Sequence, residues 1–331
     1  MRLTLIAALS CALIASPIAA QDDEPAPPPL PDHSQVTSQA GTLQLHVVAR
    51  GLEHPWGLAL LPDGRALVTE RNRGALRLLG RDGEISEPLA GVPEIFRYRG
   101  ETPRSQAGLF DVELHPDFAS NGLVYLSLSA PTERGASARI VRGRLVEDGA
   151  GARLEAVETI FDMAEADQDS SGLHFGGRMT IDPNTDSLYL TIGERRNISR
   201  SQDGEDQAGS VLRMTLEGQP HPQNPYLDDP EKNDFILAMG SRNSQALALD
   251  GRGQLWSAEH GPLGGDRLDL VRAGDNLGWP YITGGRDYSG APIGVGLSHA
   301  GMKSPLHVFA ETVAPSGAAF YQAPAVSGGR D

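Results

Sequence analysis

Residues 178–194 read RMTIDPNTDSLYLTIGE, an alternating apolar segment, a turn built on Pro, Asn and Asp, and a second alternating segment. Apolar residues with a period of two on both sides of a turn predict a β-hairpin. The pattern occurs three more times, in GLALLPDGRALVTE (57–70), FDVELHPDFASNGLVYLSLS (110–129) and ALALDGRGQLWSAEH (246–260). The hairpins start at Leu58, Val112, Met179 and Leu247, at intervals of 54, 67 and 68 residues. An all-β protein made of repeated units is therefore the leading interpretation.

A further strand-like element follows three of the hairpins, and we interpret each as an outer third and fourth strand. These elements are GALRLLGRDGE (74–84), GSVLRMTLEGQ (209–219) and DRLDLVRAGDN (266–276). Four-stranded antiparallel units at regular spacing predict a β-propeller. A β-sandwich with coincidental spacing is the alternative. The 39 Gly and 24 Pro of the 331 residues agree with a turn-rich β protein and argue against a helical bundle.

The spacing also predicts how the ring is completed. A fifth hairpin start lies at Ala318–Tyr321, and the sequence ends at Asp331 within that repeat. A closed ring would need this blade finished and one more. We therefore expect a six-bladed propeller whose last blade is incomplete in this chain, with the segment Thr42–Val48 as the closing strand. An open ring would leave strand edges bare, which favours aggregation.

The first residues have the pattern of an export signal. Arg2 precedes an apolar run of 13 residues, and small residues at Ser16–Ala20 offer a cleavage site, so we predict a signal peptide over residues 1–20 and a periplasmic or secreted protein. The apolar run is too short to cross a membrane. Cys11, the one cysteine, would be removed with this segment; a lipid-attachment role for it is the alternative.

Composition separates a tether from the folded part of the chain. Residues 21–40 are rich in Pro and polar groups and predict a solvated tether, so the propeller domain is expected over residues 41–331. The chain has 43 acidic and 28 basic residues, a net charge of −15, and no Lys/Arg-rich run. Such a charge repels phosphate backbones and anionic lipid, which excludes nucleic acid as an expected partner.

In a propeller, function is carried by polar residues at the ends of the inner strands. His174, in LHFGGR (173–178), enters the third hairpin, where a neutral imidazole could accept a proton. Gln106, in SQAGL (105–109), enters the second hairpin and could exchange hydrogen bonds with a polar ligand. An ordinary hydrogen-bonded histidine and a turn-stabilising amide are the alternatives.

The fourth hairpin has candidates at both ends. Arg242 and Asn243, in GSRNSQ (240–245), combine a guanidinium and an amide, which suits carboxylates or sugar oxygens; a buried arginine that bridges blades is the alternative. The exit loop EHGPLGGD (259–266) could turn backbone carbonyls toward a hard cation such as Ca²⁺. It lacks the alternating acids of an EF-hand, and a simple turn is the alternative.

Eight motifs in order resemble the soluble pyrroloquinoline-quinone (PQQ)-dependent glucose and aldose sugar dehydrogenases, which are six-bladed propellers of the bacterial periplasm. The resemblance covers about residues 43–322. Its motifs are HPWGLALLPDG (54–64), QAGLFDVELHPDF (106–118), HFGGR (174–178), TIGER (191–195), GSRNSQALALD (240–250), AEHGPLGGD (258–266), NLGWP (276–280) and APSGAAFY (314–321).

This resemblance implies an enzyme that oxidises the anomeric hydroxyl of aldose sugars to lactones. It implies that His174 is the general base, and that Gln106 contacts the substrate and the base. Arg242 with Asn243 would lie over the reactive carbonyl and acidic edge of PQQ. The physical chemistry is coherent, because a Lewis-acid cation, a base and an arginine together stabilise the transfer of hydride and proton. The partners implied are an aldose and an external electron acceptor.

The resemblance also implies a cation site, and the sequence departs from the family's motifs at several positions. It implies that the backbone carbonyls of Gly261 and Pro262 hold Ca²⁺. Leu173 stands where the glucose enzymes have an acid beside the base, and Arg195 stands where they have an amide near the cofactor, which makes Arg195 a further candidate cofactor contact. The family's last blade supplies a lysine and arginines to the cofactor, and Lys303 does not occupy that motif. Two alternatives stay open: a metal-dependent sugar lactonase and a non-catalytic sugar- or protein-binding propeller.

Overall fold

The computed structural model describes residues 31–38, 41–100, 105–149 and 151–321. These residues divide into two compact units, one that begins at Val48 and a small one that precedes it. Helix is limited, in the described ranges, to α1 (Phe118–Asn121) and short 3-10 turns at Glu165–Asp167 and Arg200–Gln202. No helix of this part of the chain is long and apolar enough to cross a membrane.

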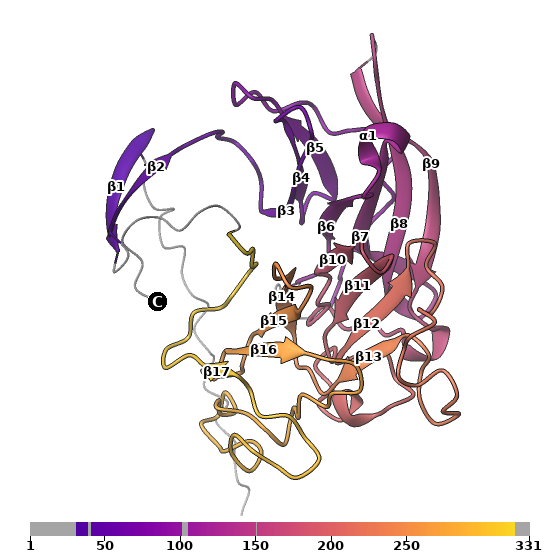
Figure 1. The fold of residues 1–331 in the computed structure, drawn as a ribbon, viewed down its shortest axis with the longest axis vertical. Coiled ribbons are helices and arrows are strands. Elements are labelled where there is room, and N and C mark those ends of the chain that lie inside the picture. The colour runs from indigo at the N-terminus through magenta and orange to yellow at the C-terminus, as the bar shows by residue number, and fades with distance from the viewer. Residues whose placement is uncertain (1–30, 39–40, 101–104, 150, 322–331) are drawn as a thin grey trace, which may run out of the picture. The chain divides into compact units, whose positions relative to one another are not determined.

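The larger unit consists of antiparallel sheets that follow one another along the chain (Figure 1). The first sheet is β3 (Pro55–Leu60), β4 (Ala66–Glu70) and β5 (Ala75–Leu79); the second is β6 (Leu109–Leu114), β7 (Leu123–Thr132), β8 (Gly135–Asp148) and β9 (Gly151–Asp162). The third is β10 (Met179–Asp182), β11 (Ser187–Ile192), β12 (Ser210–Thr215) and β13 (Ile236–Met239). The fourth is β14 (Ser244–Leu249), β15 (Leu255–Glu259), β16 (Arg267–Val271) and β17 (His307–Val308).

The first strands of successive sheets contact one another. β3 lies against β6, β6 against β10, and β10 against β14. Sheets that meet through their innermost strands in this way are the blades of a propeller. The all-β propeller with four-stranded antiparallel blades is therefore confirmed, as are the four hairpins that the alternating segments predicted.

The number of blades is the first correction. Six were predicted, and the described residues form four, the first of them with three strands. The expected fifth hairpin start at Ala318–Tyr321 forms no strand, and its continuation lies outside the described residues. Instead, this segment packs on the fourth blade, where the Phe320 ring lies 5.8 Å from that of Trp256.

The outer strands are a second correction. The elements 74–84, 209–219 and 266–276 supply one third strand each, and the fourth strands come from segments that no pattern predicted. β13 and β17 have four and two residues, which is too short to show alternation. β8 and β9 have 14 and 12 residues, and their register shifts twice along the pair, which interrupts a simple period of two.

The small unit corrects the prediction for the N-terminal region. Within the expected tether, His33–Ser38 forms β1, which pairs with β2 (Gly41–His46) in a two-stranded sheet. The segment Thr42–Val48 was expected to close the ring, but its residues in β2 pair with the adjacent strand β1. The remainder of the predicted tether up to residue 30, and the predicted signal peptide, lie outside the described residues.

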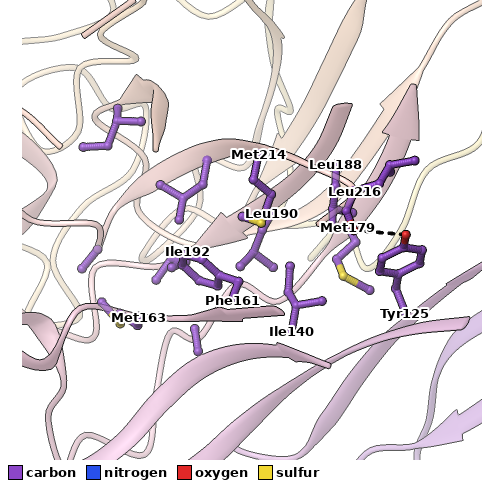
Figure 2. Close-up of a cluster of buried hydrophobic side chains, with 14 of the residues drawn as sticks. Tyr125, Ile140, Phe161, Met163, Met179, Leu188, Leu190, Ile192, Met214 and Leu216 are labelled. Carbon is purple, nitrogen blue, oxygen red and sulfur yellow. Dashed lines mark hydrogen bonds between the residues drawn. The ribbon is translucent and has the colours of Figure 1, made fainter. Parts of the chain in front are cut away.

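A hydrophobic core cluster lies between the second and third blades (Figure 2). Tyr125, Ile140 and Phe161 of the second blade meet Leu188 and Leu190 of the third, and all five are at most 3% exposed. The Tyr125 hydroxyl donates a hydrogen bond to the carbonyl of Leu216 at 3.2 Å, so its polar atom is satisfied inside the core. Burial of one such side chain contributes about 1.5–3 kcal/mol. This packing holds the third blade, whose ends carry the site described next.

Candidate active site

Loops from the third and fourth blades meet at one end of the propeller unit. The segments before β10 and after β11 hold His174 and Glu194, and the segments before β14 and after β15 hold Arg242 and Gly261. The backbone ties these loops together, because the amide of Glu194 donates to the carbonyl of Arg242 at 2.9 Å. The sequence candidates His174, Arg242 and Gly261, far apart in the chain, thus lie at one site.

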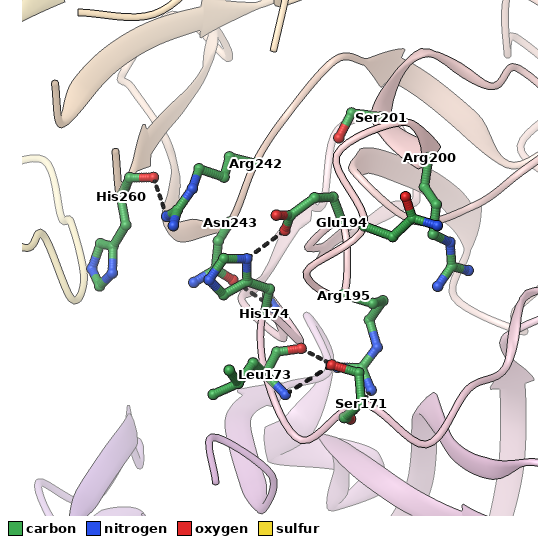
Figure 3. A network of polar contacts seen from close by, with 12 residues as sticks. Ser171, Leu173, His174, Glu194, Arg195, Arg200, Ser201, Arg242, Asn243 and His260 are labelled. Atoms are coloured by element: carbon green, nitrogen blue, oxygen red, sulfur yellow. Dashed lines mark hydrogen bonds and ion pairs between the residues drawn. The ribbon is translucent and has the colours of Figure 1, made fainter. Parts of the chain in front are cut away.

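His174 is the centre of this site (Figure 3). It is 4% exposed and has φ +51°, a left-handed conformation that a non-glycine residue adopts only where its surroundings enforce it. Its Nδ1 is hydrogen-bonded to Glu194 Oε2. Because this contact occupies Nδ1, the hydrogen bonding assigns the proton to Nδ1 and leaves Nε2 as the proton acceptor.

The electrostatics keep this imidazole neutral. Burial lowers the pKa of His174 below its usual value, and the nearby positive charges of Arg242 and Arg196 lower it further. The Glu194 carboxylate acts in the opposite direction and raises the pKa, but burial is the largest cause. A neutral imidazole with one free nitrogen and a carboxylate behind it is the arrangement of a general base.

Gln106 fixes the loop that carries the base. Its side-chain Oε1 accepts a hydrogen bond from the backbone amide of His174 at 2.7 Å. The backbone amide of Gln106 donates to the carbonyl of Gly172 at 2.7 Å. The predicted proximity of Gln106 to His174 is thus observed. The contact is with the backbone of the base, so Gln106 positions the strained turn.

Arg242 reaches from the fourth blade toward the exit loop. Its Nη1 donates to the carbonyls of His260 at 3.0 Å and Gly261 at 2.9 Å, and its guanidinium carbon lies 5.5 Å from the centre of the Trp279 ring. The Arg242 side chain is buried, and the backbone amide of Arg242 donates to Glu259 Oε2 at 2.6 Å. These contacts hold one face of the guanidinium at the site.

Asn243 joins the loops of the third and fourth blades. Its Oδ1 accepts hydrogen bonds from the amide of Gly176 at 3.2 Å and from Gln245 Nε2 at 3.1 Å. Gly193 passes so close to it that a Cβ there would lie 2.9 Å from Asn243 Oδ1 and 2.4 Å from the carbonyl oxygen of His174. The glycine is required by this close approach of two loops.

Arg195 lies behind the His174 loop. Its Nη1 donates to the carbonyl of Leu173 at 2.7 Å, and its Nη2 to Asp169 Oδ1 at 3.2 Å and to the carbonyl of Ser171 at 2.5 Å. Its guanidinium carbon lies 3.5 Å from the centre of the Phe175 ring, and burial lowers its pKa to about 10. Arg195 therefore supports the His174 loop, with both terminal guanidinium nitrogens bound to protein groups.

Comparison with known proteins identifies the family of this chain. A family model described as glucose/sorbosone dehydrogenase matches residues 52–328. The chain belongs to this family. It is 33% identical over 292 residues to the aldose sugar dehydrogenase YliI of Escherichia coli, a match that covers 87% of this chain and 76% of that protein.

Solved structures of family members have the same fold. The apo-form of the soluble aldose sugar dehydrogenase of Escherichia coli matches with a TM-score of 0.75 at 33% identity, over 82% of this chain and 76% of that one. The PQQ-bound aldose sugar dehydrogenase of Streptomyces coelicolor matches with a TM-score of 0.67 at 30% identity, over 87% and 75% of the two chains. The family predicted from the eight sequence motifs is thereby confirmed.

The residues of this glucose/sorbosone dehydrogenase family member fit an acidic aromatic cofactor. The Trp279 indole is 2% exposed, and its Nε1 has no hydrogen-bond acceptor within the described residues. The Arg242 guanidinium carbon lies over this indole, 5.5 Å from the ring centre, so a positive charge and an aromatic face are close together. A carboxylate of a flat cofactor would pair with the guanidinium through charge-assisted hydrogen bonds.

The predicted cation site consists of backbone carbonyl oxygens. Carbonyl oxygens such as those of Gly261 and Pro262 suit Ca²⁺. Gly261 O accepts the hydrogen bond from Arg242, so the guanidinium and a cation would share one oxygen. No group of three His, Cys, Asp or Glu side chains in the described ranges could hold a metal.

Sequence reasoning did not assign roles to Glu194 or Arg196. Glu194 is the last residue of the 178–194 hairpin and lies in the quoted TIGER motif, so its position at a strand end was an available signal. Arg196 has φ +65° and lies on the exposed side of the site. Nothing in a linear pattern indicates that the consecutive Arg195 and Arg196 point to different surroundings.

Proposed function

We propose that this protein oxidises the anomeric hydroxyl of aldose sugars to lactones, with PQQ and Ca²⁺ bound beside His174, and passes the electrons to an external acceptor. We further propose that it acts after export, in the periplasm or outside the cell. The buried His174–Glu194 pair is the observation that carries the proposal, because the carboxylate occupies Nδ1 while Nε2 has no hydrogen-bond partner among the described residues. Membership of the family and the PQQ-bound relative support it.

In this proposal each residue has a defined task. Bound PQQ would supply the acceptor for the hydride from C1 of the sugar, and Ca²⁺ would supply a Lewis acid for the quinone. His174 Nε2 accepts the hydroxyl proton, and Glu194 stabilises the imidazolium that results. Gln106 keeps the base in its strained turn, and Arg242 compensates negative charge at the acidic edge of the cofactor.

The arrangement favours this function over the two alternatives. A binding scaffold does not require a buried histidine that has a left-handed backbone conformation and is hydrogen-bonded to a carboxylate, as His174 is to Glu194. Such backbone strain is typical of catalytic sites. A lactonase that holds its metal by side-chain carboxylates needs a cluster of acids, and the described residues contain no group of three.

The test is dye-linked oxidation of D-glucose, D-galactose and maltose by the purified protein, with PQQ and CaCl₂ added separately and together. We expect activity only when both are present, and a loss of about 10²-fold or more in kcat for His174→Gln. PQQ affinity, measured by absorbance titration, should be retained in that variant. Activity in the absence of PQQ, or full activity of His174→Gln, would refute the proposal.

A further inference from the structure

A second arginine faces the site from the solvent side. Arg196 is exposed, and its guanidinium carbon lies 5.5 Å from the centre of the Tyr288 ring. Arg242 Nη2 lies 3.4 Å from the hydroxyl of the same tyrosine. Tyr288 therefore stands between two guanidinium groups, one buried and one exposed. We call Arg196, Arg242 and Tyr288 the arginine rim.

The rim is adjacent to the base. The amide of Glu194, the partner of His174, donates to the carbonyl of Arg242 at 2.9 Å, and Arg196 follows Glu194 by two residues in the same loop. Arg242 is also tied to the exit loop through its hydrogen bonds to the carbonyls of His260 and Gly261. Both arginines of the rim are thus attached to the loops that hold the base.

The loop that carries Tyr288 is held in place before any ligand binds. Leu263 and Arg286 exchange backbone hydrogen bonds at 2.9 and 3.1 Å, which fastens this loop to the exit loop of the fourth blade. Asp287 accepts hydrogen bonds from the amide and the hydroxyl of Ser289 at 2.9 and 2.6 Å, and its amide donates to Ala291 at 2.9 Å. The tyrosine is thus preorganised by its turn.

Arg196 acts electrostatically on the nearby carboxylate of Asp287 without pairing with it. In the part of the chain that the structure describes, the Arg196 guanidinium has no hydrogen bond or ion pair, although Asp287 is close enough for Arg196 to help lower its pKa. Arg195, its neighbour in sequence, is bound by contrast to Asp169 and two carbonyls. An unpaired guanidinium beside a second one, in a protein of net charge −15, marks a local site for anions.

We propose that the arginine rim binds a carboxylate group of a molecule that lies against His174. A guanidinium pairs with a carboxylate through charge-assisted hydrogen bonds, and a phenol between two such groups adds a further donor. This inference rests on the proposed function and extends it to substrate class. The carboxylate belongs either to an acidic aldose, such as an alduronic acid with its anomeric hydroxyl at the base, or to the cofactor.

Two arginine variants test the rim. Arg196→Gln removes its exposed charge, and Arg252→Gln is the matched control, because Arg252 is also exposed but lies in the β14–β15 turn at the opposite strand ends from Arg242. Each is compared with the unaltered protein for kcat/KM on D-galacturonate and D-galactose, which differ only at C6. Calorimetry measures binding of both sugars to the cofactor-free protein, and absorbance titration measures PQQ affinity.

For a substrate carboxylate, Arg196→Gln lowers the galacturonate-to-galactose ratio of kcat/KM about tenfold and leaves PQQ affinity unchanged. For a cofactor carboxylate, it weakens PQQ about tenfold and affects both sugars equally. In either case raised salt reduces the difference, because an exposed pair is screened. If Arg196→Gln matches Arg252→Gln in every measurement, the rim is refuted.

Failure of the proposed function is distinguishable from failure of the rim. If no aldose is oxidised by any form of the protein, the dehydrogenase proposal is wrong. The binding titrations then still decide the rim: an Arg196-dependent preference for galacturonate over galactose, or an Arg196-dependent affinity for PQQ, supports it, and the absence of both overturns it.

Discussion

Replacement of Glu194 by Gln tests the central pair of the site. The His174 and Glu194 side chains are 6% and 2% exposed, so solvent does not screen their interaction. A hydrogen bond to a charged group contributes about 1.5–3 kcal/mol. The imidazolium that forms when His174 accepts a proton would lose that stabilisation in the variant. Since 1.36 kcal/mol corresponds to a factor of ten in rate, we expect kcat to fall about 10- to 100-fold.

The pH profile gives a second, independent readout. Glu194 raises the pKa of His174 against the larger effect of burial, so its removal lowers that pKa further. The neutral, active form of the base exists above the pKa, and activity is lost as the pH falls through it. The acidic limb of the kcat profile should therefore move to lower pH in Glu194→Gln, which a purely structural defect would not produce.

The assay is dye-linked aldose oxidation between pH 4 and 8 at saturating PQQ and CaCl₂, with thermal unfolding recorded for each variant. Glu165→Gln is the matched control, because the Glu165 side chain is 82% exposed and pairs with Arg134 at the surface. An unchanged kcat with an unmoved acidic limb, in a Glu194→Gln protein that unfolds at the normal temperature, would refute the assignment of this pair.

Two further outcomes follow from close packing around the site. Gly193→Ala places a Cβ 2.4 Å from the carbonyl oxygen of His174 and 2.9 Å from Asn243 Oδ1, so we expect activity to fall at least tenfold while far-UV circular dichroism stays unchanged; normal activity would show that the loops move apart freely. Asp111→Ala removes the buried partner of Arg178, whose Nη1 lies 3.1 Å from Asp111 Oδ1. Urea titration should show a loss of about 3 kcal/mol in the free energy of unfolding, and a loss below about 1 kcal/mol would contradict the role of this ion pair.

The parts of the fold that could be predicted from sequence are those specified locally. Each hairpin contains its alternation and its turn within 14 to 20 consecutive residues, so the pattern is complete in one window. A fourth strand forms by adding to the free edge of a sheet that is already present. Strand β17 consists of His307 and Val308, which pair with Arg267 and Leu268 of β16. Two residues have no period, and their state depends on a partner about 40 positions away.

The candidate site could be predicted to a similar extent. His174, Gln106, Arg242 and Asn243 could be selected as candidates because they lie beside strand ends in recognisable motifs. The direction of the Arg195 side chain could not be predicted, since its backbone has φ +57° and the turn directs its side chain behind His174. A local reversal of backbone handedness decides which side chains face a ligand, and no regular pattern of residues records it.

The meeting of separate blades at His174 also makes the site a reporter of folding. Each hairpin can form from contacts within itself, whereas Gln106, His174 and Arg242 come together only after neighbouring blades dock, across sequence separations of 68 residues. Loss of docking abolishes the constellation while strand pairing within each blade persists. In a denaturant titration, catalysis would then disappear before β-structure does, and the interval between the two transitions would measure the cohesion between blades.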